Sequence, residues 1–194
     1  MRKNLILPVL ACFFAALTTV GAYIALPFPG SPVPIVLQNL FIMLSALLLG
    51  PTWSLVSVLI YLALGALGLP VFAGGTGGFA RFMGPTGGYL VGYIPGVLAM
   101  GAISRAGARR PWKDAAAIVV GMSIVYACGL LWLKNAINAD WPKALAVGLL
   151  PFVPGDILKT AVAAISAPRL RRILDRSLDA ISANAENADE RPEV

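Results

Sequence analysis

The sequence predicts an all-α integral membrane protein in which six transmembrane helices are joined by irregular external loops. The first indication is the composition, since 58% of the 194 residues are hydrophobic, only 12% are charged, and the mean hydropathy is +0.81. A soluble domain is about one-quarter charged. The second indication is that the apolar residues form runs separated by proline- and glycine-rich segments, because such runs can cross a bilayer as helices.

The hydrophobic runs predict six helices in chain order. The first begins after Arg2 and Lys3, and its length favours a spanning helix over a signal peptide. Within it, Ala11 and Ala15 place two small residues on one face, a spacing that lets helices approach closely. Pro154 fits the first turn of the last helix better than its interior. The six predicted helices are residues 5–26, 35–50, 52–69, 86–103, 115–133 and 154–167.

The segments between the helices differ in character. Residues 27–34 contain four prolines and must form an extended loop. Residues 74–88 are dense in glycine and form either a flexible turn or a loop folded into the mouth of a cavity, with Arg81 as its only charge. Residues 143–152 are apolar but short, as in an interfacial or re-entrant segment. Gly84, Gly88, Gly92 and Gly96, spaced by four, indicate tight packing of the fourth helix against a neighbour.

The chain predicts one membrane domain, residues 1–177, followed by a polar tail, residues 178–194, that we expect to be disordered and cytoplasmic. The net charge of +6 does not indicate nucleic-acid binding, because the basic residues adjoin the hydrophobic runs. The absence of His removes the commonest general base and metal ligand, so we expect no enzyme, metal or cofactor. Cys12 and Cys128 are expected to be small buried hydrophobes.

Basic residues indicate the orientation in the membrane. Six spans place both termini on one side, where ten Lys and Arg residues gather, whereas the other side has only Arg81, Lys134 and Lys143. By the positive-inside rule both termini are cytoplasmic, in the cell membrane. The ten residues are Arg2, Lys3, Arg105, Arg109, Arg110, Lys113, Arg169, Arg171, Arg172 and Arg176.

Asp156 and Lys159 form an acid–base pair inside the apolar run that ends the membrane domain. Charges in a bilayer cost at least ~2.5 kcal/mol, so they usually face a cavity, a partner or a ligand. In a helix, residues i and i+3 share a face, and the helix dipole favours an anion but not a cation in the first turn. The pair therefore indicates either a polar ligand or a structural ion pair between helices. Gln38, Asn39 and Arg81 lie in or beside segments on the same, external side.

Three stretches together carry a family resemblance: residues 32–39 (PVPIVLQN), residues 68–79 with 84–89 (GLPVFAGGTGGF and GPTGGY), and residues 154–159 (PGDILK). Their order and spacing resemble the biotin-specific substrate-binding component of energy-coupling-factor (ECF) transporters, the BioY family. The resemblance covers residues 11–167. It implies a six-helix protein that captures biotin from outside and associates with a transmembrane coupling protein and two cytoplasmic ATPases on separate chains. Homo-oligomers are a further possibility.

The resemblance also assigns roles. Asp156 would accept from a ureido N–H of biotin and Lys159 would donate to an oxygen, both as charge-assisted hydrogen bonds. Gln38 and Asn39 would add donors and acceptors, and Arg81 would meet the carboxylate. The aromatic side chains Tyr89, Tyr126 and Trp132 would wall the apolar ring. Ala11 and Ala15 resemble the small-residue motif that docks such components on the coupling protein.

Two other functions compete with this interpretation. A secondary transporter driven by an ion gradient would use Asp156 as its proton or sodium site, but such folds usually repeat interrupted helices, and the first half has no second Pro-Gly-Asp-like segment. A membrane-embedded enzyme would need a base, a nucleophile or a metal cluster that the chain does not offer. No Gly-x-x-x-x-Gly-Lys-Ser/Thr motif is present, so an ATPase must lie on another chain.

Overall fold

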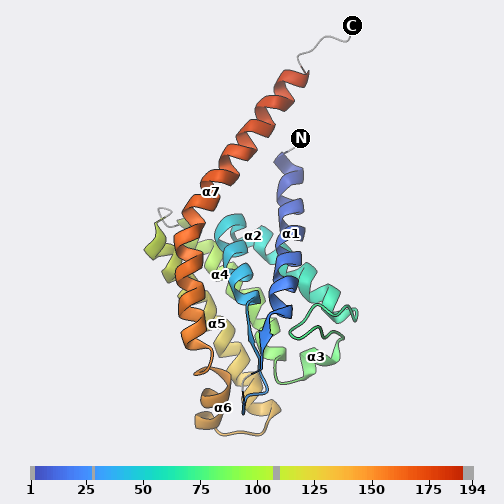
Figure 1. The fold of residues 1–194 in the computed structure, drawn as a ribbon, viewed down its shortest axis with the longest axis vertical. Coiled ribbons are helices and arrows are strands. Elements are labelled where there is room, and N and C mark those ends of the chain that lie inside the picture. The colour runs from blue at the N-terminus through green and yellow to red at the C-terminus, as the bar shows by residue number, and fades with distance from the viewer. Residues whose placement is uncertain (1–2, 28, 107–109, 190–194) are drawn as a thin grey trace.

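The computed structural model describes residues 3–27, 29–106 and 110–189, and within them the predicted all-α fold is confirmed. The two strands are only two residues long and pair antiparallel, with Ala25 opposite Val36. The elements are α1 (Lys3–Tyr23), β1 (Ala25–Leu26), β2 (Ile35–Val36), α2 (Gln38–Ala66), α3 (Ala80–Met83), α4 (Gly87–Ala106), α5 (Pro111–Ala136), α6 (Trp141–Gly148) and α7 (Val153–Asp189) (Figure 1).

Fewer helices of the described chain are long and apolar enough to cross a membrane than the six that the sequence predicts. Four helices of the described chain, α1, α2, α4 and α5, are long and apolar enough to cross a membrane, and α6 with α7 makes a fifth if the pair, bent by 48°, is one span. The predicted helices 35–50 and 52–69 correspond to the two halves of α2, which begins only at Gln38, after β2, ends at Ala66, and leaves helical geometry at Gly50. Figure 1 shows the two halves of α2 running in different directions. Helix lengths alone therefore do not give the predicted six.

The break in α2 follows from two neighbouring residues. Gly50 has φ 75°, a left-handed conformation that favours glycine, and a Cβ there would collide with the guanidinium of Arg105. Pro51 has no backbone N–H, so it cannot donate to the carbonyl of Leu47 one turn earlier. The first half of α2 thus ends with carbonyl groups that need donors from elsewhere.

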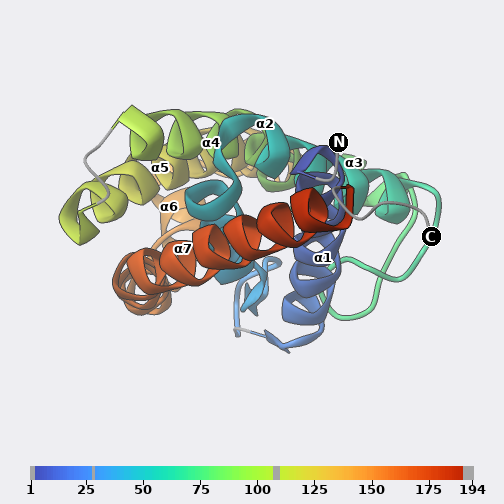
Figure 2. The same ribbon diagram turned by 90° about the horizontal axis from the view of Figure 1, so that it is seen from above.

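Helix α2 lies at the centre of the packing, with α1 on one side and α4 on the other, and α4 packs along α5 (Figure 2). The predicted glycine ridge is confirmed as a packing surface for three of its four members. Cβ atoms on Gly88 and Gly96 would collide with α5, at Trp132 and Val125 respectively, and a Cβ on Gly92 would be crowded by the same helix. Gly84 lies before α4 and takes no part in this contact.

Ala11 and Ala15 do not lie on an open surface. Their exposed fractions are 0% and 4%, and they belong to the core that α1 forms with α2, where Ala11 packs in a cluster with Phe14 and Leu49. Their small size allows α1 to approach α2 closely. The expected docking face for a separate protein is therefore replaced by a contact within the chain. The exposed small residues of α1 are Cys12 and Ala16, each about 100° around the helix from the buried alanine before it.

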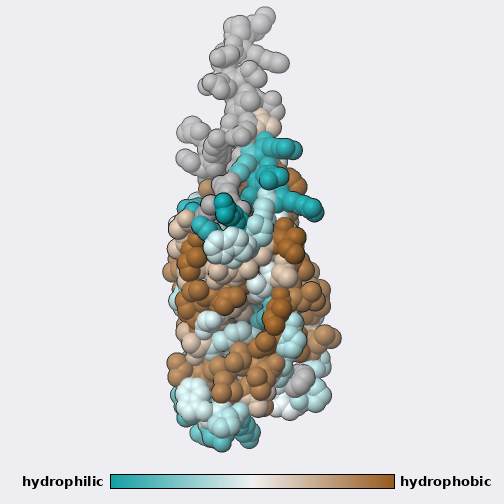
Figure 3. All heavy atoms as spheres, turned by 90° about the vertical axis from the view of Figure 1, so that its left-hand side faces the viewer, coloured by the Kyte–Doolittle hydropathy of each residue, from teal (hydrophilic) through white to brown (hydrophobic). Residues whose placement is uncertain are grey.

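The two ends of the molecule differ. The start of α1 and the end of α7 lie together at one end, and the connections between β1 and β2, between α2 and α4, and around α6 lie at the other (Figure 1). Figure 3 shows a wide hydrophobic band between hydrophilic residues at both ends. This surface is the one expected of a protein that crosses a bilayer.

Helix α7 begins at Val153, which places Pro154 in its first turn as predicted. It then continues to Asp189, so the backbone of residues 178–189, which we expected to be disordered, is helical. Alanine, leucine and glutamate in this stretch are good helix formers and extend the helix of the membrane domain. Residues 190–194 of the expected tail lie outside the described residues.

Candidate functional site

A cavity lies at the end of the molecule opposite the termini. The proline-rich connection, the glycine-rich loop and helices α2, α4, α5 and α7 all contribute to its lining. Six of the seven predicted ligand-binding residues line it, although they lie up to 121 residues apart in the chain, from 38 to 159. They are Gln38, Asn39, Arg81, Tyr89, Tyr126 and Lys159.

The seventh residue, Asp156, is not itself part of the lining, but its carboxylate is hydrogen-bonded to two side chains that are. Its carboxylate Oδ1 is 2.8 Å from the Lys159 ammonium, and its Oδ2 accepts a hydrogen bond from the Tyr126 hydroxyl. Asp156 is 7% exposed and Lys159 9%. Lys159 therefore presents the positive charge to the cavity, while Asp156 holds both Lys159 and Tyr126 in place.

A second polar group is buried on the α2 and α4 side of the cavity. The Gln38 amide nitrogen donates to the Tyr93 hydroxyl (2.8 Å), which in turn donates to Asn39 Oδ1 (2.7 Å). The Tyr61 hydroxyl donates to Gln38 Oε1 (3.2 Å). Sequence reasoning missed both tyrosines. Tyr93 could have been found, because it follows Tyr89 by one helical turn on the same face; nothing local marks Tyr61.

The glycine-rich loop is folded against the cavity, as the second of its two interpretations predicts. Gly74, Gly75 and Gly78 have φ between 70° and 96°, so the loop follows a path that favours glycine. A bridge between Phe72 and Thr76 closes its first turn. The loop places Thr76 and Arg81 in the lining, and Arg81 is exposed at the mouth of the cavity.

Apolar and aromatic side chains form the remaining wall. Tyr89 and Tyr126 meet edge to face, with ring centroids 6.2 Å apart, and the Tyr89 hydroxyl donates to the carbonyl of Gly148 (2.8 Å), which ties α6 to α4. Trp132, also expected in this wall, does not line the cavity. Its indole N–H donates to the carbonyl of Gly84 (2.9 Å), which holds the ring on the outside, 41% exposed.

This arrangement can bind a small molecule with a polar head and an apolar body. A buried ammonium–carboxylate pair, amides and hydroxyls gather at one side of an aromatic cavity, and a guanidinium lies at its mouth. No group of three or more His, Cys, Asp or Glu that could hold a metal occurs among the described residues.

Comparison with known proteins identifies the family. The sequence profile of the BioY family matches residues 2–176. The chain belongs to the BioY family. The resemblance seen in the three sequence stretches is thereby confirmed, and residues 177–194 lie beyond the match.

Two BioY relatives and one solved structure show how far the similarity extends. The biotin transporter BioY of Thermotoga maritima is 42% identical over 163 residues, which are 84% of this chain and 94% of that protein. The biotin transporter BioY of Rhodobacter capsulatus is 39% identical over 178 residues, 86% of this chain and 92% of that protein. The crystal structure of the S-component for biotin from an ECF-type ABC transporter matches with a TM-score of 0.82 and 30% identity, covering 88% of this chain and 93% of that one.

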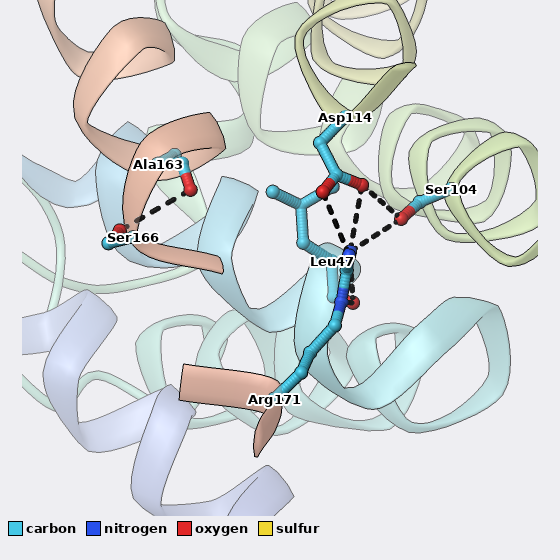
Figure 4. A network of polar contacts seen from close by, with 6 residues as sticks. All are labelled: Leu47, Ser104, Asp114, Ala163, Ser166 and Arg171. Carbon is cyan, nitrogen blue, oxygen red and sulfur yellow. Dashed lines mark hydrogen bonds and ion pairs between the residues drawn. The ribbon is translucent and has the colours of Figure 1, made fainter. Parts of the chain in front are cut away.

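A third polar cluster lies far from the cavity. Arg171 of α7 is 6% exposed, and its guanidinium contacts Asp114 of α5, Ser104 of α4 and the carbonyl of Leu47 in α2 (Figure 4). The carbonyl of Leu47 is the one that Pro51 leaves without a helical donor. From the sequence, Arg171 is only one of the ten basic residues that indicate topology, because nothing local distinguishes it from Arg169 or Arg172.

The two cysteines remain free thiols. Cys128 is half-buried, but Cys12 is exposed. The expectation that both are buried is therefore wrong for Cys12. In a membrane protein an exposed apolar side chain within a spanning helix can face lipid, so its exposure needs no polar partner.

Proposed function

We propose that this protein captures biotin with high affinity and acts in its uptake as the substrate-binding component of an ECF-type ABC transporter. The observation that carries the proposal is the buried Lys159–Asp156 pair, with the ammonium facing an aromatic cavity. The names of its relatives and the 0.82 TM-score to the S-component for biotin support the ligand.

The proposed contacts follow from the cavity's chemistry. The ureido ring of biotin offers two N–H donors and a carbonyl acceptor, so it suits the end with Lys159, Asp156 and Asn39. Lys159 donates to the carbonyl oxygen, and Asp156 accepts a ureido N–H with a lone pair that Tyr126 leaves free. Tyr89 and Tyr126 contact the apolar ring. Arg81, at the exposed mouth, pairs with the carboxylate of the biotin tail.

We propose that the cavity opens to the outside of the cytoplasmic membrane and that both termini are cytoplasmic. Six spans result if the two halves of α2 count separately and α7 crosses with α1, α4 and α5. The basic residues then lie on the cytoplasmic side, as the positive-inside rule requires. The coupling protein and two ATPase subunits of the transporter are separate chains.

Two measurements test this function. Purified protein should bind radiolabelled biotin, and the binding should survive without any partner. Uptake in cells should stop when cytoplasmic ATP is depleted and continue when an uncoupler collapses the ion gradients. Uptake that fails with the uncoupler while ATP persists would instead favour an ion-coupled secondary transporter, and purified protein that does not bind biotin would refute the proposed ligand.

A further inference from the structure

The polar chain beside the cavity has a direction that can be followed bond by bond. Tyr61 donates to the oxygen of the Gln38 amide, the nitrogen of the same amide donates to Tyr93, and Tyr93 donates to the oxygen of the Asn39 amide. A hydroxyl group can donate only one hydrogen. Each bond in the chain therefore determines the direction of the next.

Tyr61 determines the direction of the whole chain. Its side chain is 0% exposed, and Gln38 is the only hydrogen-bond partner of its hydroxyl within the part of the chain that the structure describes. If the Gln38 amide were reversed, the buried hydroxyl hydrogen of Tyr61 would have no acceptor there. Leaving a buried donor unpaired is unfavourable, so Tyr61 must donate and the Gln38 oxygen must face it.

The far end of the chain is Asn39, which lines the cavity. Because Tyr93 donates to its oxygen, the Asn39 amide is turned so that its NH₂ group is available to the cavity. In the reverse direction Asn39 would instead give its nitrogen to Tyr93 and turn its oxygen to the cavity. The Tyr61 hydroxyl does not line the cavity, yet through Gln38 it decides whether the site offers a donor or an acceptor at Asn39.

We propose that Tyr61, acting through Gln38 and Tyr93, is a positioning residue that makes Asn39 a hydrogen-bond donor to the carbonyl oxygen of the ligand's ureido ring. This inference rests on the proposed function, since it assigns one contact with biotin. Asn39 and Lys159 both line the cavity, so one ligand group can contact the two side chains. A carbonyl oxygen has two lone pairs and can accept from Lys159 and Asn39 together.

The experiment compares biotin with 2-iminobiotin, in which an imino group replaces the carbonyl oxygen. Wild-type protein should prefer biotin. Tyr61→Phe removes the group that determines the direction, so both orientations of the two amides become populated. We expect its preference for biotin over 2-iminobiotin to fall by roughly ten- to one-hundred-fold, the effect of losing one buried hydrogen bond.

A second variant reverses the direction at the cavity itself. Asn39→Asp still accepts from Tyr93 but presents a charged acceptor oxygen in place of NH₂, so its preference should invert in favour of 2-iminobiotin, whose guanidine group is protonated at neutral pH. Tyr23→Phe is the matched control, because the exposed Tyr23 hydroxyl donates to the Pro70 carbonyl outside the cavity. This control should keep the wild-type preference.

The ratio of the two affinities separates positioning from general destabilisation. Equal losses for both ligands in Tyr61→Phe would overturn the inference and give Tyr61 a purely structural role. Retained preference for biotin in Asn39→Asp would also overturn it, and this result does not depend on how well Tyr61→Phe folds. Wild-type protein that binds neither ligand would refute the proposed function, and this inference with it.

Discussion

Arg171 of α7 and Asp114 of α5 form a buried ion pair, with guanidinium Nη1 2.8 Å from carboxylate Oδ2. The two residues are 57 positions apart in the chain. The Asp114 carboxylate also accepts from Ser104, and the guanidinium donates to the carbonyl of Leu47. Four helices thus meet at one guanidinium group, at the end of the molecule opposite the cavity.

Replacing Arg171 should destabilise the protein without touching the cavity. Arg171→Met leaves Asp114 as an unpaired buried charge, and the expected loss in the free energy of unfolding is about 3–5 kcal/mol. Arg172→Met, one residue along the same helix and exposed, is the matched control and should change little. Chemical unfolding of the purified proteins measures both, and equal stability of the two variants would contradict the role of Arg171.

The double variant Asp114→Asn with Arg171→Met should recover only part of this loss. Removing both charges eliminates the unpaired carboxylate, which alone is often tolerated. The carbonyl of Leu47, however, still lacks a donor, because neither Pro51 nor Met at position 171 can supply one. Full recovery in the same unfolding measurement would show that the contact with Leu47 contributes nothing.

Replacing either member of the charge pair at the cavity, Asp156 or Lys159, should weaken ligand binding. Asp156→Asn and Lys159→Met should each weaken biotin binding by roughly 2–5 kcal/mol, because either change leaves the other group buried and unpaired. This corresponds to about thirty-fold to several-thousand-fold in affinity. Lys143→Met, an exposed lysine on α6, serves as control. Titration with biotin and thermal unfolding of each variant separate binding from stability.

The double variant of this pair decides between a ligand site and a structural ion pair. If Asp156 and Lys159 hold the ligand, their combined replacement by Asn and Met should not restore binding. A purely structural pair predicts the opposite, since replacing both members of a buried pair is often tolerated. Near-normal affinity in the double variant would therefore remove these residues from the binding site.

Larger residues on the buried face of α1 should disrupt its packing. Ala11→Leu and Ala15→Leu force a larger side chain between α1 and α2, and each should destabilise the protein by about 1–3 kcal/mol. Ala16→Leu, on the exposed face of the same helix, should leave the unfolding midpoint nearly unchanged. If Ala11→Leu and Ala16→Leu unfold alike, α1 does not pack as described.

Cysteine labelling tests the orientation in the membrane. In a background without Cys12 and Cys128, Ser177→Cys near the basic end should be shielded from a membrane-impermeant thiol reagent in intact cells. Asn135→Cys, exposed at the opposite end of α5, should be labelled. The reverse result would place the cavity on the cytoplasmic side and refute its proposed outward opening.

Features that depend on local sequence were predicted well. Pro154 marks the first turn of α7, and the glycine spacing marks the contact between α4 and α5, because backbone restrictions and missing side chains act wherever those residues occur. The charge pair was recognisable because an acid and a base three residues apart are rare in an apolar run.

Features that depend on packing were missed or misassigned. The spacing of Ala11 and Ala15 shows that a helix can approach there, but not whether its neighbour is α2 or another protein. Tyr61 lies 23 residues from Gln38, and only the path of α2 around Gly50 brings the two together. Arg171 has the same local surroundings as the exposed arginines beside it, so its burial follows from the tertiary fold alone.

The contact between Leu47 and Arg171 bears on how the protein is made, since 124 residues separate them. When the second helix leaves the ribosome, the arginine that will cap its broken end has not yet been synthesised. Asp114 is likewise synthesised before Arg171, its partner in the ion pair. The packing of α2 at its break is therefore complete only after α7 has been synthesised and has packed against it. A chain that ends just before Arg171 would keep every residue that lines the cavity, but it would lack the guanidinium that joins α2, α4 and α5 to α7.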